Sequence, residues 1–306
     1  MNEKDIDSLT ENRPIKAEEH LKHGYVPDFI ERTYRIFARF MIFLLRLKGE
    51  SRYSNIFIQL LNPVFKVKWD MSKSLWFRTG HGRLLWRART FFSEEPMMID
   101  WIKKFTQNDV FLDIGANVGM YTIPGAYMAG IAYACELDPI NIGILKENIH
   151  LNGLHNKIII LPFAAGESSK IVRVYYRDFS KGDALQSIER ETVLNTFEGE
   201  GKHISLQLSF SIDKIFQDFE LQQPTRIKID VDGNEMVVFR GGAKTIFSAD
   251  EIYFEDSGLR DCGQIIEEIL GNGYKVLNTE IPAGSKGGRN IIFKKDKHKF
   301  EPDYSQ

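Results

Sequence analysis

The chain of 306 residues has only two cysteines, Cys135 and Cys262, and they do not form a CxxC pair. Nothing in this spacing indicates a disulfide framework, and such cysteine usage is expected of a protein in a reducing cytoplasm. The sequence also has no excess of charge of one sign, with 40 Lys and Arg, 42 Asp and Glu and a net charge of −2. Because binding to phosphate backbones normally requires a basic face or domain, we expect no nucleic-acid partner.

Long hydrophobic runs are missing as well. The first twenty residues are polar and acidic where the apolar segment of a secretory signal would lie. The densest apolar block, residues 34–49, contains Arg35, Arg39 and Arg46, and it is too short and too charged for a bilayer span of about 20 apolar residues. Two interpretations of this predicted helix stay open. It lies in peripheral contact with the inner, anionic membrane face, or it packs as a docking or dimer helix of a homo-oligomer.

The patterning predicts three regions, and the second of them contains an insertion. Residues 1–93 form an accessory region with a charged start, the helix described above and short strands. Residues 94–295 alternate between helix and strand, which predicts an α/β, Rossmann-like, doubly wound and mostly parallel sheet. Residues 166–210 are an insertion with two strand-like segments around a polar stretch, which we interpret as a lid or a pocket-lining loop. Residues 296–306 form a polar tail.

The segment 65–90 is rich in aromatic and basic residues. Its alternation predicts short strands, including one over GRLLWRART. Aromatic faces stack on sugar rings and arginines hold phosphates or carboxylates, so the segment is a candidate for substrate recognition. Ordinary packing is the alternative. The residues concerned are Trp69, Trp76, Trp86, Arg78, Arg83 and Arg87, with His81 as a candidate base.

The most informative motif is VFLDIGANVGMYT at residues 110–122. A buried strand ends at Asp113, and Gly115 and Gly119 allow a ligand to approach the main chain. The loop lacks the Lys and hydroxyl of GxxxxGK[ST], and Asn117 replaces the second glycine of GxGxxG. A ligand without pyrophosphate tolerates that change. S-adenosylmethionine (SAM) is one, since Asp113 and the loop amides can bind its ammonium and carboxylate.

Two further strand ends complete the predicted cofactor site. The run IAYACE ends at Glu136, about 20 residues past the glycine loop, where a carboxylate accepts hydrogen bonds from ribose hydroxyls. The third strand leads to Phe163 and Ala164, which offer an apolar wall and main-chain groups to adenine.

Acids also end two later strands. IKIDVDGNE, residues 227–235, delivers Asp230 and Asp232 to a glycine turn, and EIYFED ends near Glu255. Because adjacent strands lie about 4.8 Å apart, we expect Asp230 and Glu255 to face one another as the catalytic pair. A carboxylate there acts on an acceptor hydroxyl as a general base or orients it. Asp230 and Asp232 are also candidate ligands for Mg²⁺, although helix capping is the simpler interpretation of Asp232. Lys228 is ambiguous, and we interpret it as a charge at the sheet edge or as a charge that supports the site residues from behind.

With these motifs in hand, the chain resembles the FkbM-type SAM-dependent methyltransferases. The resemblance rests on FLDIGANVGMYT, ACELDP, KENIHLNGL, LPFAAGE, SIDKIF and IKIDVDGNE, the last resembling a KIDVEGAE-like string of the family. It implies a class I methyltransferase fold and O-methylation of a small-molecule or glycan acceptor, such as a sugar, a glycan precursor or a secondary metabolite.

Three alternatives stay open. The enzyme methylates nitrogen on a small molecule, it is an NAD-linked dehydrogenase, or it is a non-catalytic scaffold docked on a membrane. Several residues are assigned only weakly to the pocket, namely Asp183, Ser187, His203 and the loop at 284–288.

Overall fold

The structure, a computed structural model, describes residues 63–80, 82–176, 187–188, 203–258, 260–282 and 288–296, together with the helical positions 33, 36, 37 and 40. The chain divides into two compact units, Met1–Leu61 and Asn62–Gln306. Almost all of the predicted helix at 34–49 lies outside the described residues, so its interpretation stays a prediction. All elements described below belong to the second unit, and the boundary expected after residue 93 falls inside it.

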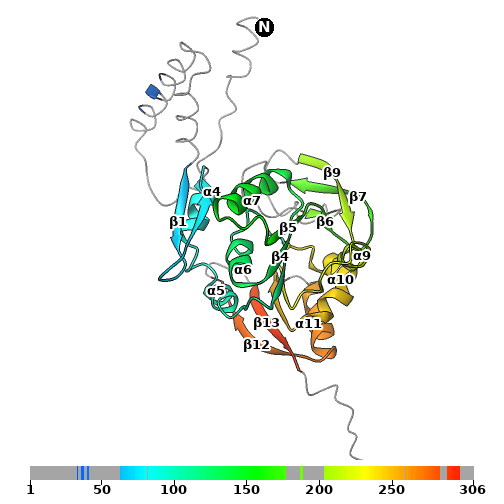
Figure 1. Cartoon of the computed structure of the whole chain (residues 1–306). Helices are drawn as coiled ribbons and strands as arrows, with labels where there is room; N and C mark the ends of the chain where they lie inside the picture. Colours follow the sequence, from blue (N-terminus) through cyan, green and yellow to red (C-terminus); the bar gives the residue numbers. More distant parts are fainter. Residues whose placement is uncertain are drawn as a thin grey trace, which may run out of the picture. The chain divides into compact units, whose positions relative to one another are not determined.

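A seven-stranded sheet forms the centre of this unit (Figure 1). All its strands are parallel except the antiparallel β13. In spatial order the strands are β12 (Tyr274–Glu280), β13 (Arg289–Lys295), β11 (Glu251–Asp256), β10 (Arg226–Ile229), β3 (Val110–Ile114), β4 (Ile131–Cys135) and β5 (Ile158–Leu161). The prediction of a doubly wound, mostly parallel α/β sheet is therefore confirmed.

Helices cover both faces of the sheet, because its central strands are apolar on both faces. On β3, Phe111 packs into one core and Leu112 into the other. Figure 1 shows α6 and α7 on one side of the sheet and α10 and α11 on the other. The first core receives α4 (Gly82–Arg89), α5 (Pro96–Ile102), α6 (Thr122–Met128) and α7 (Pro139–Leu151). The second receives α9 (Ile212–Asp218), α10 (Glu235–Ser248) and α11 (Arg260–Gly271).

The strand order reverses between β3 and β10, because the chain passes from β3 through β4 to β5 and later returns to the other side of β3. Open α/β sheets bind ligands at the carboxyl ends of the strands beside such a reversal. The register makes those ends level, since Ile114 pairs with both Cys135 and Ile229, and Ile229 pairs with Phe254. The next residues therefore share one edge of the sheet: Gly115, Glu136, Asp230 and Glu255.

The segment before the central sheet contains a hairpin and a helix. Strands β1 (Val64–Lys68) and β2 (Ser74–Arg78) pair antiparallel, as predicted. The strand predicted over GRLLWRART is wrong, because most of this segment forms α4. Leu84 and Ala88, one helical turn apart, are both buried, and this spacing places an apolar stripe on one helix face.

Two asparagines, one in α7 and one at its C-terminal cap, bind the backbone of β2. Asn152 accepts a hydrogen bond from the Trp76 N–H at 3.0 Å and donates one to the Trp76 carbonyl at 2.7 Å. Asn148, one turn earlier, accepts from the Arg78 N–H at 2.8 Å. These amides satisfy strand-edge groups that would otherwise need water or another strand. The KENIHLNGL motif thus attaches the hairpin to the central unit.

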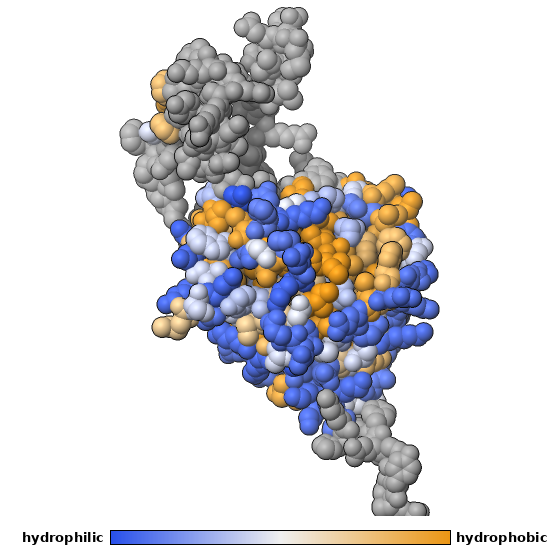
Figure 2. Space-filling model, in the orientation of Figure 1, coloured by the Kyte–Doolittle hydropathy of each residue, from blue (hydrophilic) through white to orange (hydrophobic). Residues whose placement is uncertain are grey.

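The insertion forms a second, four-stranded sheet with the order β6-β9-β7-β8. Its two long strands, β7 (Lys170–Tyr176) and β9 (His203–Phe210), pair antiparallel and confirm the predicted strand-like segments. The short strands are β6 (Ala164–Ala165) and β8 (Ser187–Ile188). Figure 2 shows hydrophobic residues on the side of the molecule where β7 and β9 lie. The exposed side chains there are Ile171, Ile204, Leu206 and Leu208. Most of the polar stretch, interpreted as a lid, lies outside the described residues.

Within the described residues we find no helix with the length and hydrophobicity that a membrane crossing requires.

Candidate active site

The loop after β3 packs directly against the turn after β10. Gly115 has φ +85°, and a Cβ there would lie 1.8 Å from the carbonyl oxygen of Asp230. Gly119 also has φ +85°, and a Cβ there would lie 2.5 Å from Cδ1 of Leu145. Asn117 between them has φ +50°, a conformation that Asn tolerates better than most residues. Gly115 therefore allows the two backbone segments to approach, and Gly119 leaves room for the Leu145 side chain. The approach of a ligand to this main chain stays a prediction.

Glu136 stands at the end of β4 with both carboxylate oxygens bound to backbone amides. One oxygen accepts from the Asn117 N–H and the other from the Asp138 N–H, both at 2.7 Å. Burial raises the pKa of Glu136 to about 7, although these hydrogen bonds oppose the shift. The carboxylate is thus fixed in position next to the glycine loop. Each oxygen keeps a second lone pair for a ligand hydroxyl.

A cavity lies at this edge of the sheet, between the ends of β3, β4, β10 and β11. Most of the residues predicted from the sequence contribute to its wall, namely Gly115, Asn117, Glu136, Phe163, Asp230, Asp232 and Glu255. Asp113, Gly119 and Ala164 do not line it. Gly119 packs towards Leu145, and Ala164 is fully buried while its neighbour Ala165 reaches the cavity.

Asp113 differs from its predicted position, since its carboxylate does not point into the crevice. Its side chain is 1% exposed and lies beneath the cavity wall. It accepts a hydrogen bond from the Thr122 hydroxyl at 2.5 Å and forms an ion pair with Lys228 at 3.2 Å. On an alternating strand, Asp113 shares the sheet face of Phe111, which α6 covers. Asp113 therefore acts on the site indirectly, through its ion pair with Lys228.

Lys228 is a central residue whose role the sequence leaves open. Its ammonium lies 2.9 Å from Oδ2 of Asp230 and 3.3 Å from the Gly115 carbonyl oxygen. Burial alone would lower the pKa of Lys228, but the charges of Asp113 and Asp230 outweigh it and raise the pKa above its usual value. The edge position is wrong, because β10 has strands on both sides, whereas a supporting charge behind the site agrees with the contacts to Asp113 and Asp230. The spacing of Lys228 and Asp230, two residues apart on one strand, is the signal that places them on one face.

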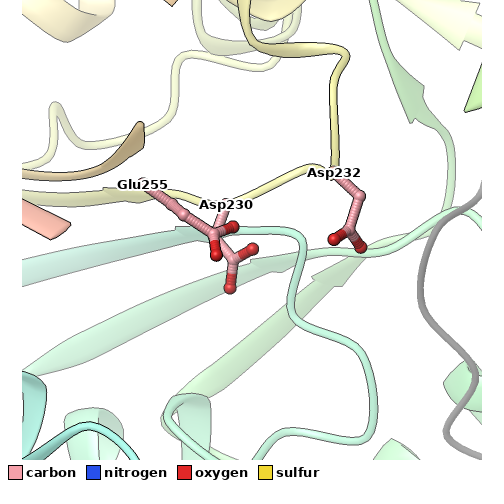
Figure 3. A group of neighbouring side chains, drawn as sticks. All are labelled: Asp230, Asp232 and Glu255. Carbon is pink, nitrogen blue, oxygen red and sulfur yellow. The ribbon is translucent and has the colours of Figure 1, made fainter. Parts of the chain in front are cut away.

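Asp230 and Glu255 point towards one another across adjacent strands, and Asp232 stands further along the turn (Figure 3). Burial opposes the charge of Asp230, but Lys228 and a hydrogen bond with Glu255 hold the Asp230 pKa below its usual value. The Asp230 charge, followed by burial, raises the pKa of Glu255 well above its usual value. The pair therefore shares one proton near neutral pH. Glu255 carries that proton and donates to Asp230.

The three carboxylates of Asp230, Asp232 and Glu255 each offer an oxygen within 4.8 Å of the others. This is the arrangement that the sequence analysis considers for Mg²⁺. The Lys228 ammonium, 2.9 Å from Asp230, already supplies a cation to this cluster. The cluster thus has an internal source of positive charge.

The wall opposite the glycine loop comes from residues that precede β3. Arg87, Glu94 and Glu95 line it, and Tyr121, from the segment after β3, also contributes to the cavity wall. The Tyr253 hydroxyl donates to Glu95 at 3.2 Å. Burial, followed by the charge of Asp230, raises the pKa of Glu95. The sequence signal for this wall was the acidic pair before PMMIDWI, which directly precedes α5.

Several weakly assigned residues are not part of the described cavity wall. His81, Asp183 and residues 284–287 lie outside the described residues, and the side chains of Ser187 and His203 are likewise not described. Trp69 packs on Phe91 and Phe92. Of the tryptophans and arginines considered for substrate recognition, only Arg87 lines the cavity.

The doubly wound sheet is Rossmann-like. A glycine loop at the strand-order reversal and an acid at the end of the second strand are the features with which such folds bind nucleotide-like ligands. The family model for the methyltransferase FkbM domain matches residues 113–276. The chain belongs to this methyltransferase family.

Two curated proteins are similar to parts of the chain. Hexuronic acid methyltransferase AglP of Haloferax volcanii is 22% identical over 174 residues, which are 56% of this chain and 65% of that protein. A tRNA (guanine(37)-N(1))-methyltransferase of Batrachochytrium dendrobatidis is 33% identical over 88 residues, which are 28% of this chain and 17% of that protein. The chain spans less than two thirds of the length of either relative.

Solved structures with a similar arrangement include an FkbM methyltransferase from Methylobacillus flagellatus KT, with a TM-score of 0.44 and 16% identity over 62% of this chain and 44% of that chain. A tRNA m1G37 methyltransferase of M. jannaschii has a TM-score of 0.41 and 18% identity over 73% of this chain and 55% of that chain.

Proposed function

We propose that the protein is a SAM-dependent O-methyltransferase that acts on a hydroxyl of a sugar, a glycan precursor or a secondary metabolite. The observation that carries the proposal is the cavity wall, in which the glycine loop and Glu136 follow β3 and β4 and the Asp230–Glu255 pair stands at the ends of the neighbouring strands β10 and β11. Membership of the FkbM methyltransferase family supports the reaction class. The similarity to a protein named for hexuronic acid methylation supports a sugar acceptor.

The residues on the glycine-loop side fit SAM. Glu136 offers two fixed oxygens to ribose hydroxyls, and Phe163 offers an apolar ring at the cavity for the adenine base. The backbone of Gly115 and Asn117 borders the space assigned to the methionine end. When bound, SAM supplies a methyl group on a sulfonium, which a hydroxyl oxygen can attack in line.

The residues on the opposite side suit deprotonation of a hydroxyl. Asp230 remains ionised because Lys228 is 2.9 Å away, so its carboxylate accepts a hydrogen bond from the acceptor O–H. As the new carbon–oxygen bond forms and the carbon–sulfur bond breaks, the hydroxyl proton passes to Asp230. Glu255 keeps its own proton and orients the Asp230 carboxylate. Asp113 holds Lys228 from below.

A divalent cation is not required in this proposal, because Lys228 already stabilises the Asp230 charge. The Mg²⁺ alternative is tested by assaying the protein with EDTA and with added Mg²⁺. Loss of activity with EDTA that Mg²⁺ restores would assign Asp230, Asp232 and Glu255 as ligands.

A nucleic-acid acceptor is the main alternative substrate. The net charge of −2 argues against it, but the similarity to a tRNA methyltransferase does not support its exclusion. Methylation of nitrogen on a small molecule is a second alternative, and such a nitrogen would depend less on Asp230 as a base.

The experiment that tests the function compares a deletion strain with the wild-type strain by mass spectrometry of surface glycans, small metabolites and RNA. We expect a glycan or metabolite to lose the mass of one methylene per missing methyl group. A plasmid copy should restore the methyl group, and a copy encoding Asp230→Asn should not. Loss confined to RNA or protein would contradict the proposed acceptor class.

A further inference from the structure

Arg87 is the feature of the cavity that the proposed function leaves unused. It lies on α4, one turn after Arg83, and its side chain contributes to the cavity wall. Its Nε is fully buried and has no hydrogen-bond partner among the described residues. A buried N–H without an acceptor is costly, and a guanidinium has five such donors to satisfy.

Other arginines of the described fold have carboxylate partners. Arg226 lies 2.9 Å from Asp109, Arg78 lies 2.6 Å from Glu147, and Arg289 lies 3.1 Å from Asp256. Arg87 forms no ion pair with any described carboxylate. The cavity therefore contains a cation whose buried Nε–H has no acceptor among the described residues, whereas Arg78, Arg226 and Arg289 each form an ion pair.

The two acids that interact with the charge of Arg87 have other partners. The charge of Arg87 favours the ionised forms of Glu94 and Asp230, but Asp230 is already paired with Lys228 at 2.9 Å. Glu94 accepts a hydrogen bond from the Thr90 hydroxyl at 3.2 Å, and burial raises its pKa. Among the described residues no further acid pairs with Arg87, and an oxyanion group of a ligand suits the planar donors of a guanidinium.

We propose that Arg87 binds an oxyanion of the acceptor, a carboxylate or a phosphate, so that the methylated substrate is an acidic sugar-like small molecule. This inference rests on the proposed function. It names a substrate class and a specificity residue for the same cavity. Arg87 holds the anionic end of the acceptor while Asp230 receives the proton of the hydroxyl that becomes methylated.

The test uses the full chain in three forms: wild type, Arg87→Gln and the matched control Arg89→Gln, which removes the same charge from an exposed position of the same helix. Calorimetry first measures S-adenosylhomocysteine binding to each form. Each saturated protein is then titrated with D-glucuronate, D-glucose 6-phosphate and D-glucose. The first two probes separate a carboxylate from a phosphate, and glucose is the neutral control. Thermal melts verify that all three forms are folded.

We expect at least one anionic sugar to bind wild type and Arg89→Gln, with glucose weaker, and Arg87→Gln to lose roughly tenfold or more in affinity for that anion. Equal binding by wild type and Arg87→Gln, equal binding of glucose, or no binding of either anion overturns the inference. Weaker S-adenosylhomocysteine binding in Arg87→Gln also overturns it, because Arg87 would then serve the cofactor. Failure of wild type to bind S-adenosylhomocysteine contradicts the proposed function instead, and the sugar titrations still report on Arg87.

Discussion

The Lys228 ammonium, on the buried strand β10, lies 2.9 Å from Oδ2 of Asp230, which directly follows the last residue of that strand. This contact connects the two halves of the cavity, because the same ammonium also lies 3.3 Å from the carbonyl oxygen of Gly115 in the glycine loop. It holds Asp230 in the charged form that a general base requires. The positions of cofactor loop and base are therefore coupled through one side chain.

Asp230→Asn should lower kcat by about 10²- to 10⁴-fold if Asp230 accepts the proton of a hydroxyl. The amide cannot accept that proton, although its size is nearly the same. SAM affinity, measured by calorimetry, should change little because Glu136 and the glycine loop remain. Activity within a few-fold of wild type would instead favour a nitrogen acceptor.

Glu255→Gln should retain most of the activity, whereas Glu255→Ala should lose much of it. Because the charge of Asp230 keeps Glu255 protonated, glutamine reproduces a neutral donor of similar shape and alanine does not. Single-turnover assays of both variants make the comparison. If the glutamine variant is as impaired as Asp230→Asn, Glu255 rather than Asp230 is the base.

SAM binding should weaken as the pH falls below about 7, the value to which burial raises the pKa of Glu136. Protonation removes the carboxylate that accepts from the ribose, so the dissociation constant should rise by roughly tenfold per pH unit. Glu136→Gln should bind SAM weakly at every pH.

The folding stability of the free protein depends on the titration of Glu136 in the opposite direction. The raised pKa contributes stability below the ordinary value of 4.5, and this contribution is lost as the pH rises through about 7.

Gly115→Ala should destabilise the protein by at least about 2 kcal/mol and abolish SAM binding. Its Cβ would lie 1.8 Å from the Asp230 carbonyl oxygen, at a φ of +85°. Gly143→Ala is the control, since a Cβ there meets nothing within 4 Å and helix propensity should add about 0.5–1 kcal/mol. Denaturant melts compare the two. Equal stability of both variants would contradict the close packing of loop and turn.

The strand ends were predictable from the sequence, whereas their supporting contacts were not. Gly115, Glu136 and Asp230 follow apolar runs, and parallel strands necessarily bring such positions to one edge. The burial of Asp113 beneath Lys228 depends on the adjacency of β3 and β10, which are more than 100 residues apart in the sequence. Local patterning carries no information on that pairing.

Helix α4, in the accessory region, is another element that the local sequence pattern does not determine. Aromatic and basic residues in GRLLWRAR fit either an alternating strand or a short helix, and burial of Leu84 and Ala88 against the first core decides for the helix. The sequence alone did not distinguish the roles of the arginines in this region. Their separation into Arg78, paired with Glu147, and Arg87, which faces the cavity, follows from tertiary packing.

Calorimetric titration of the wild-type chain and of Glu136→Gln with SAM, and of wild type with NAD, tests the central claim most directly. We predict that SAM binds wild type at one site, that Glu136→Gln weakens this binding by roughly 10- to 100-fold through loss of charged hydrogen bonds, and that NAD does not compete. Binding of NAD in place of SAM, or SAM binding that is indifferent to Glu136, would contradict the assignment of this cavity.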